Sequence, residues 1–231
     1  MPDASKVNSM FARIASRYDL ANRALSFGID RIWRNRLVEE VDYRKPRDVV
    51  DLATGSGDVA FALQDGLPSN TRIKGLDFCA PMIDEANRKQ AKRANSKIEF
   101  GIGDILNLPL EDASADAITI SFGFRNLEDR NRGLLEMKRI LKPDTGHLFI
   151  LEFSQPHPFY RPFYYFYLKR ILPAFASLLT GDYDAYRYLS DSIESFPDRK
   201  GIALELKQAG FRKVSSIPMA LGSVALHIGQ A

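Results

Sequence analysis

The sequence predicts an α/β fold with a doubly wound, mostly parallel seven-stranded sheet that ends in an antiparallel hairpin. Between residues 46 and 154, short apolar segments alternate with longer amphipathic ones, which is the pattern of parallel strands joined through helices. At the end of the chain, two strand-like segments follow each other with only a Gly-Ser turn between them. Strands joined that tightly must pair in antiparallel fashion.

The composition predicts one cytoplasmic domain, residues 1–231. A chain of 231 residues is long enough for one full core. Its net charge of +3, from 32 basic and 29 acidic residues, is too balanced to indicate a nucleic-acid partner. The single cysteine, Cys79, excludes an internal disulfide and fits a reducing compartment. Neither a secretory signal nor an apolar run of roughly 20 residues is found.

The first 45 residues are expected to form a helical cover. Two groups of apolar residues recur there at helix spacing: Met10, Phe11, Ile14 and Tyr18, then Ile32, Trp33, Leu37 and Val41. The core then follows, with strands expected at 48–53, 72–78, 97–104, 116–124 and 146–154. Helices are expected between them at 59–67, 80–94 and 130–142, the second with Pro81 in its first turn and the third stopped by Pro143.

Residues 155–197 interrupt this alternation. The segment is too long for a plain connector, so it is expected to form a helical insert that covers part of the molecule. A helix at 198–210 follows it, and the closing strands are expected at 211–222 and 223–231. A parallel sheet finished by such a hairpin is unusual among dinucleotide-binding folds and is typical of class I S-adenosylmethionine-dependent methyltransferases.

A glycine-rich turn follows the first strand in "VVDLATGSGDVA". Gly55 and Gly57 let the backbone turn sharply and let a ligand approach Ser56 and the helix N-terminus behind it. The pattern also fits nicotinamide and flavin enzymes, and a glycine pair can serve the strand-to-helix turn alone.

Three successive strands end in an aspartate. Asp77, followed by Phe78, comes about 20 residues after the turn, where an acid can accept hydrogen bonds from both ribose hydroxyls of a nucleotide. Asp51 is expected to meet the amino group of a methionine moiety, and Asp104 an adenine edge. Packing alone explains such a series poorly, so the pattern favours S-adenosylmethionine over a dinucleotide.

The chain resembles the ubiquinone/menaquinone biosynthesis C-methyltransferases along its whole length. The stretches "MFARIASRYDLANRALSFGIDRIWR", "GIGDILNLPL", "SFGFRNLEDR", "YRYLSDSIESFPD" and "GFRKVSSIPMALGSVALHIG" carry the resemblance. It implies a class I methyltransferase with these cofactor-binding residues: Ser56, Asp77, Asp104 with Ile105, and Ser121. The chain departs from the family pattern at Asp30, where a histidine is expected, at Thr54, often a glycine, and at Phe124, an aliphatic place.

The resemblance implies methylation of a ring carbon of a polyprenylated quinol, with conversion of demethylmenaquinol to menaquinol favoured. A methoxy-polyprenyl-benzoquinol is the alternative substrate. More distant alternatives are a small-molecule O- or N-methyltransferase, a nicotinamide-dependent oxidoreductase, and a non-enzymatic module that keeps the fold.

The residues that leave the fourth strand are candidates for catalysis. A ring carbon becomes nucleophilic when the neighbouring hydroxyl loses its proton, so the site needs a positive group for the resulting oxyanion. Arg125 is expected to supply it, with Asn126 orienting the ring. Tyr18 and Asp19 are further candidates, Asp19 as a proton acceptor. The alternative is that Arg125 pairs with Glu128 or Asp129 and only caps the next helix.

The insert is rich in aromatic residues, with seven in the nine positions from 159 to 167. Such a stripe is typical of a core or of a homodimer contact. Flanked by Lys169 and Arg170, it also fits peripheral contact with an anionic membrane and with an isoprenoid tail. No metal is expected, because the spacings of the three histidines match no ligand pattern.

Overall fold

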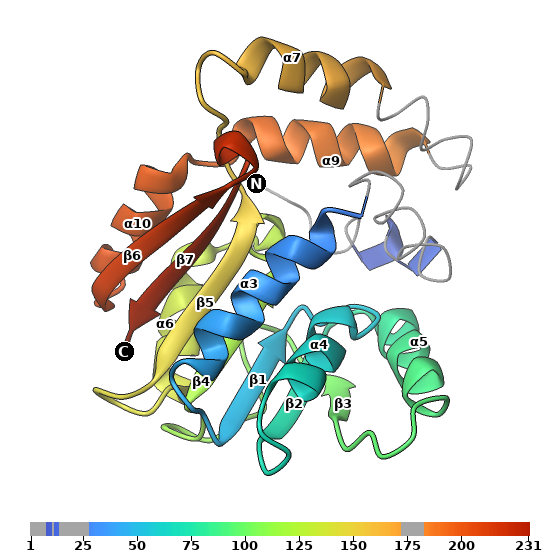
Figure 1. The fold of residues 1–231 in the computed structure, drawn as a ribbon, viewed down its shortest axis with the longest axis vertical. Coiled ribbons are helices and arrows are strands. Elements are labelled where there is room, and N and C mark those ends of the chain that lie inside the picture. The colour runs from blue at the N-terminus through green and yellow to red at the C-terminus, as the bar shows by residue number, and fades with distance from the viewer. Residues whose placement is uncertain (1–7, 11, 14–27, 172–182) are drawn as a thin grey trace.

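The computed structural model describes residues 8–10, 12–13, 28–171 and 183–231, with side chains from 187 onward in the last range. A seven-stranded sheet runs through the molecule in the order β3-β2-β1-β4-β5-β7-β6 (Figure 1). The first five strands are parallel, and β7 is antiparallel to both β5 and β6. The predicted fold class is confirmed. Tyr18 and Asp19 lie outside the described residues.

The strands are β1 (Asp48–Leu52), β2 (Arg72–Asp77), β3 (Glu99–Ile102), β4 (Ala117–Ser121), β5 (His147–Phe153), β6 (Arg212–Met219) and β7 (Val224–Gln230). The helices are α3 (Asp30–Asp42), α4 (Asp58–Gly66), α5 (Ala80–Gln90), α6 (Arg130–Ile140), α7 (Arg161–Phe166), α9 (Tyr183–Ser195) and α10 (Arg199–Gln208). Short turns of other helix types are η2 (Phe124–Asn126), η3 (Tyr167–Ile171) and η4 (Ala220–Gly222).

Helices cover both faces of the sheet because its strands alternate which face each side chain enters. In β1, for example, Val50 and Leu52 pack on the side of α6 and α10, whereas Val49 packs on the side of α3 and α4. Side-chain caps begin two of these helices: Asp129 accepts a hydrogen bond from the Arg132 backbone N–H in α6, and Asp198 does the same for Gly201 in α10.

Two of the parallel strands end two or more residues earlier than the sequence predicts. The third strand stops at Ile102, so Asp104 lies two residues beyond it, and the fourth stops at Ser121 rather than at residue 124. The backbone of Phe122 has a φ of +56°, which an extended strand does not adopt, and η2 begins two residues later. Arg125 and Asn126 are therefore presented by a tight helical turn rather than by a strand.

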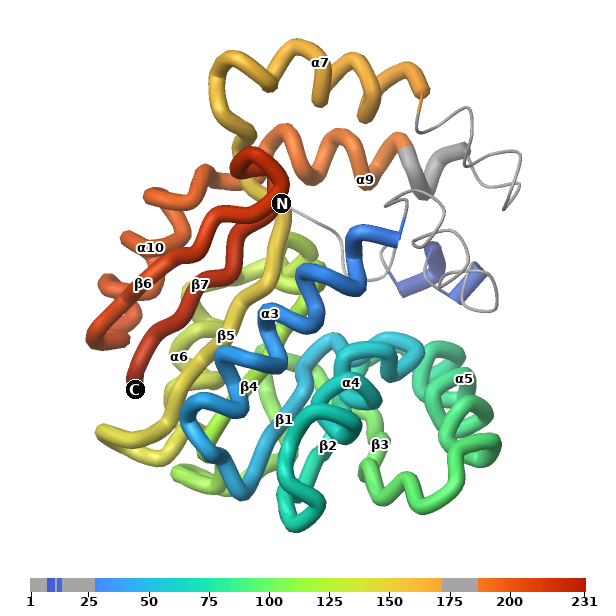
Figure 2. The backbone as a smooth tube through the Cα atoms, in the orientation of Figure 1, coloured from blue at the N-terminus to red at the C-terminus, as the bar shows by residue number. Residues whose placement is uncertain are grey.

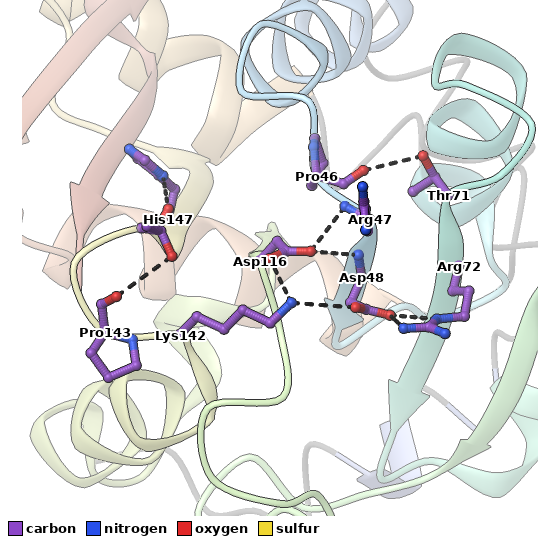
Figure 3. A network of polar contacts seen from close by, with 10 residues as sticks. Pro46, Arg47, Asp48, Thr71, Arg72, Asp116, Lys142, Pro143 and His147 are labelled. Atoms are coloured by element: carbon purple, nitrogen blue, oxygen red, sulfur yellow. Dashed lines mark hydrogen bonds and ion pairs between the residues drawn. The ribbon is translucent and has the colours of Figure 1, made fainter.

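The amino-terminal edge of the parallel strands is closed by a polar network (Figure 3). Asp116 accepts hydrogen bonds from the backbone N–H groups of Arg47 and Asp48, both at 2.9 Å. Lys142 donates to Asp116 at 2.7 Å, and Arg72 pairs with Asp48 at 2.6 Å. These contacts join the loops that lead into β1, β2, β4 and β5.

The opposite, carboxyl-terminal edge lies under the insert. In Figures 1 and 2, α7 and α9 sit beyond the ends of β1 and β5, at the end of the molecule where these strands point. The Ser190 hydroxyl of α9 donates to the Leu168 carbonyl oxygen of η3 at 2.6 Å, which holds the two parts of the insert together. Among the described residues, no helix has the length and apolar character needed to cross a bilayer.

Candidate functional site

The turn between β1 and α4 leaves backbone open at Gly55 and packs tightly at Gly57. Both glycines have positive φ, +55° and +88°. A Cβ at Gly57 would lie 2.8 Å from the Phe100 ring and 2.9 Å from the Phe61 ring, so no larger residue fits. A Cβ at Gly55 would meet no described atom within 4 Å. The turn is thus fixed from below by Gly57 and offers bare backbone to a ligand at Gly55.

Asp77 ties this turn to the neighbouring strand. Its carboxylate accepts hydrogen bonds from the backbone N–H groups of Gly55, at 2.8 Å, and Cys79, at 2.9 Å. Burial raises the pKa of Asp77 above its ordinary value. Each carboxylate oxygen retains a lone pair after these bonds, so Asp77 can still accept from ribose hydroxyls. The partly exposed ring of Phe78 lies next to it in the chain.

Asp51 lies beneath the turn rather than at its surface. Its two oxygens accept hydrogen bonds from the Thr54 and Thr119 hydroxyls, each at 2.6 Å. Burial raises the pKa of Asp51 to about 6. Thr54, one of the departures from the family pattern, therefore supplies a partner to this acid. Contact between Asp51 and an amino group stays a prediction.

A chain of charges connects α3 with Ser56. Lys89 donates to the Ser56 hydroxyl at 2.9 Å and to Asp58 at 2.7 Å. Asp58 also pairs with Arg34 at 3.0 Å, and Arg34 pairs with Asp30. Burial opposes the ionisation of Asp58, yet Lys89 and Arg34 hold its pKa below the ordinary value. Asp30, in place of the expected histidine, thus joins a network that ends at the glycine turn.

The remaining predicted cofactor residues differ in their surroundings. Asp104 is exposed and accepts a hydrogen bond from the Leu106 backbone N–H at 2.9 Å, whereas Ile105 is buried in the core. The Ser121 hydroxyl, at the end of β4, is buried and has no partner among the described residues. An unpaired buried hydroxyl beside an open glycine turn fits a site that awaits a ligand. These residues therefore fit S-adenosylmethionine.

Arg125 is buried and pairs with an acid that the sequence analysis did not select. Its Nη1 lies 2.9 Å from the Glu152 carboxylate, and the guanidinium stacks over Phe153 at 5.2 Å from the ring centroid. The suggested pairing with Glu128 or Asp129 is not the one found: the acid that pairs with Arg125 is Glu152, and Asp129 caps α6. A usable signal was present: an acid in the apolar run "LFILEFS" must have a buried partner.

Asn126 is engaged by the insert. Its side-chain Oδ1 accepts a hydrogen bond from the Tyr188 hydroxyl of α9 at 3.0 Å. Burial raises the pKa of Tyr188, so this hydroxyl stays protonated at neutral pH and can donate. The structure thus brings Arg125 and Asn126 together with Glu152 and Tyr188. Their roles in catalysis stay predictions.

The comparisons with known proteins agree in one family. The model of the ubiE/COQ5 methyltransferase family matches residues 2–231. A demethylmenaquinone methyltransferase of Thermus thermophilus is 41% identical over 221 residues, which cover 95% of this chain and 99% of that protein. A ubiquinone/menaquinone biosynthesis C-methyltransferase of Geotalea daltonii is 38% identical over 227 residues, with 97% and 96% covered.

Solved structures agree on the fold. A SAM-dependent methyltransferase of Aquifex aeolicus superposes with a TM-score of 0.58 at 18% identity, over 84% of this chain and 96% of that one. A phosphoethanolamine N-methyltransferase of Haemonchus contortus in complex with S-adenosyl-L-methionine gives 0.58 at 15% identity, over 80% of this chain and 38% of that one.

These matches decide between the cofactors that the glycine turn left open. The protein is a methyltransferase that uses S-adenosylmethionine, and the nicotinamide-dependent alternative is not supported. By sequence along nearly its whole length, the chain belongs to the ubiE/COQ5 methyltransferase family.

Proposed function

We propose that this methyltransferase acts on a ring carbon of a polyprenylated demethylmenaquinol. Relatives named demethylmenaquinone methyltransferase, from Thermus thermophilus and from Thermotoga maritima, are 41% and 44% identical to the chain and support this substrate. The name of the Geotalea daltonii relative covers ubiquinone biosynthesis as well. A methoxy-polyprenyl-benzoquinol is therefore the second candidate.

The observation that carries the chemical proposal is the buried turn with Arg125 that follows the end of β4. The turn begins three residues after Ser121, whose hydroxyl is unpaired among the described residues. The Nε of Arg125 is likewise buried without a hydrogen-bond partner there. A guanidinium N–H stays protonated at neutral pH, so a buried one beside a cofactor-type site is suited to donate to the oxygen of a ring hydroxyl as that hydroxyl loses its proton.

In this proposal, each residue of the site has a separate role in methyl transfer. S-adenosylmethionine supplies an electrophilic methyl group when bound. Asp77 and the Ser121 hydroxyl would hold its sugar and amino acid parts, while Arg125 would bind the ring oxygen and Asn126 would orient the ring. Stabilising the oxyanion raises the electron density on the neighbouring ring carbon, and a fixed ring orientation aims that carbon at the donor. Tyr18 and Asp19 remain candidates for the proton.

Activity with labelled cofactor tests this proposal. The purified protein is incubated with reduced demethylmenaquinol and, in parallel, with the reduced benzoquinol, and label in each quinone is counted. We expect label in the naphthoquinone with a higher kcat/KM than in the benzoquinone. Preference for the benzoquinone would replace the first substrate by the second, and absence of label in both would reject quinol methylation.

We also propose that the insert makes peripheral contact with a lipid surface. Phe159, Phe163 and Phe166 recur at helix spacing and are exposed by 81%, 68% and 63%. Arg170 lies one turn further along the same row and is also exposed. Lys169 contributes less charge, because it pairs with Glu194 at 2.8 Å. A row of aromatic side chains with a basic end suits an anionic membrane interface, where the quinol substrate resides.

Flotation with vesicles tests this contact. The protein should float with vesicles that contain anionic lipid, and Phe163→Ser/Phe166→Ser should lose flotation while retaining cofactor binding. The matched control is Leu204→Ser, because Leu204 is an exposed apolar residue of α10 outside this row. Phe100→Leu would be unsuitable as a control, because the Phe100 ring supports the glycine turn. Wild-type protein that stays in the soluble fraction would reject the membrane contact. A dimer that the double variant abolishes would assign this row to a homodimer contact.

A further inference from the structure

The carboxylate of Glu152, near the end of β5, accepts hydrogen bonds from both the backbone and the side chain of Arg125. One carboxylate oxygen, Oε1, lies 2.9 Å from the Arg125 Nη1, and the other, Oε2, accepts the Arg125 backbone N–H at 3.1 Å. The Phe153 backbone N–H also donates to Oε1, at 2.9 Å. The side chains of Arg125 and Glu152 are 5% and 0% exposed. One acid therefore fixes both the turn and the guanidinium that the turn carries.

The guanidinium is held from one side. Its Nη1 donates to Glu152 and also to the Phe122 carbonyl oxygen, and the Phe153 ring covers one of its faces. The Nε–H is buried and makes no hydrogen bond to any residue in the described ranges. A buried donor that has no hydrogen-bond partner destabilises the folded protein unless a ligand or a water molecule accepts from it. The unpaired Nε thus marks the side on which a substrate oxygen would bind.

Charge balance explains why an acid is needed at this position. An arginine alone at this depth would carry a large desolvation cost, which a carboxylate with good geometry offsets. One Glu152 oxygen binds the Arg125 backbone N–H and the other binds the guanidinium. These two contacts also prevent the Arg125 side chain from rotating away. The cost is that the pair is formally neutral, so a ring oxyanion is attracted by the oriented N–H dipoles more than by net charge.

We infer that Glu152 is a positioning residue for methyl transfer: it aims the free donor of Arg125 at the ring oxygen of the quinol. This inference rests on the proposed role of Arg125 in quinol methylation. It implies that the charge of Glu152 acts on the chemical step through Arg125 and leaves cofactor binding unchanged.

Glu152→Gln tests the inference, with Glu205→Gln as the matched control. Glu205 also pairs with an arginine, Arg130 at 2.8 Å, but this pair joins α10 to α6 and makes no hydrogen bond to Arg125. In Glu152→Gln, kcat should fall about 10- to 100-fold because the guanidinium is no longer aimed, while KM for S-adenosylmethionine stays within about twofold. The site would also become net positive, so the ionisation that limits kcat/KM at low pH should move to lower pH. Glu205→Gln should change neither quantity.

A double variant separates positioning from a general loss of structure. If Glu152 acts through Arg125, Arg125→Met/Glu152→Gln should be no slower than Arg125→Met, because the second change has nothing left to disturb. Fully additive losses would overturn the inference. If Glu152→Gln does not fold, Glu152→Asp keeps the charge on a shorter side chain and should still lower kcat, and wild-type kcat in that variant would likewise overturn it.

The outcomes also separate this inference from the proposed function. Slow turnover in Arg125→Met with wild-type turnover and an unshifted pH profile in Glu152→Gln would remove the role of Glu152 alone. Wild-type turnover in Arg125→Met would remove the proposed role of Arg125 and, with it, this inference.

Discussion

The two edges of the parallel strands are built in opposite ways. At the amino-terminal edge, the acids at the starts of β1 and β4 are paired: Asp48 with Arg72, and Asp116 with Lys142 and two backbone N–H groups (Figure 3). At the carboxyl-terminal edge, the Ser121 hydroxyl and the Arg125 Nε are buried without partners among the described residues. Residues with positive φ occur at both edges, Ala53 and Phe122 at this one and Lys45 and Asp144 at the other, so backbone strain does not distinguish them.

The difference separates stability from function within a single sheet. Both edges receive the same strands, so the strands do not explain why one edge is satisfied and the other is not. An edge that only closes the fold can pair all of its polar groups. An edge that binds ligands must keep donors and acceptors available, and it tolerates the burial of unpaired polar groups that this requires.

The strongest test of this contrast compares an aspartate from each edge. Asp77→Asn removes the charge that accepts two backbone N–H groups and, as we propose, the ribose hydroxyls. Affinity for S-adenosylmethionine should fall by roughly 100-fold, which calorimetric titration measures. Asp48→Asn, at the paired edge, should bind the cofactor as the wild type does. Equal losses in both variants would contradict a division of labour between the edges.

At Asp51 we expect the free energy of unfolding and the affinity for the cofactor to respond to substitution in opposite directions. Its pKa of about 6 in the folded protein lies above the ordinary 3.8, so the folded state binds more protons between these pH values. The contribution of Asp51 to stability is therefore present below about pH 4 and is lost as the pH rises through about 6. At pH 7.5, Asp51→Asn should be more stable than the wild type by about 3 kcal/mol in urea titrations.

The advantage of Asp51→Asn should disappear near pH 4, where the wild-type acid is also neutral. If Asp51 meets the amino group of the cofactor, the same variant should bind S-adenosylmethionine more weakly at pH 7.5. Unchanged affinity together with raised stability would restrict Asp51 to supporting the Thr54 and Thr119 hydroxyls.

The smallest effect is expected from the ion pairs of the paired edge. Lys142 and Asp116 are 35% and 24% exposed, so solvent screens much of their attraction. Lys142→Met should cost less than about 1 kcal/mol in urea titrations and should leave kcat and KM unchanged. A change in KM for the cofactor would show that the two edges communicate through the sheet.

Much of the fold could be predicted because its signals are local. The alternation of apolar runs and amphipathic helices predicts the parallel strands, and the short final turn predicts the antiparallel pair. The ends of β3 and β4 were predicted less well. The residue types of Gly103 and Phe122, which follow near these ends, do not by themselves indicate that the strand has ended. A positive φ at a phenylalanine reflects what surrounds it and is not a residue preference.

The candidate site shows the same limit. The glycine turn and Asp77 follow a spacing pattern within about 25 residues, so sequence order suffices to place them together. Glu152 and Tyr188 lie 27 and 62 residues from the groups they contact, Arg125 and Asn126. Only strand order and the return of α9 over the sheet bring those pairs into contact.

The amino-acid sequence by itself determined the strand and helix types, the family, and the residues that line the end of each strand. The tertiary structure alone decided which of those residues are satisfied and which are left with an unpaired donor or acceptor. The physical reason is range: periodicity and turn chemistry act over a few neighbouring residues, whereas burial and charge pairing depend on partners that the chain meets only when the sheet has assembled.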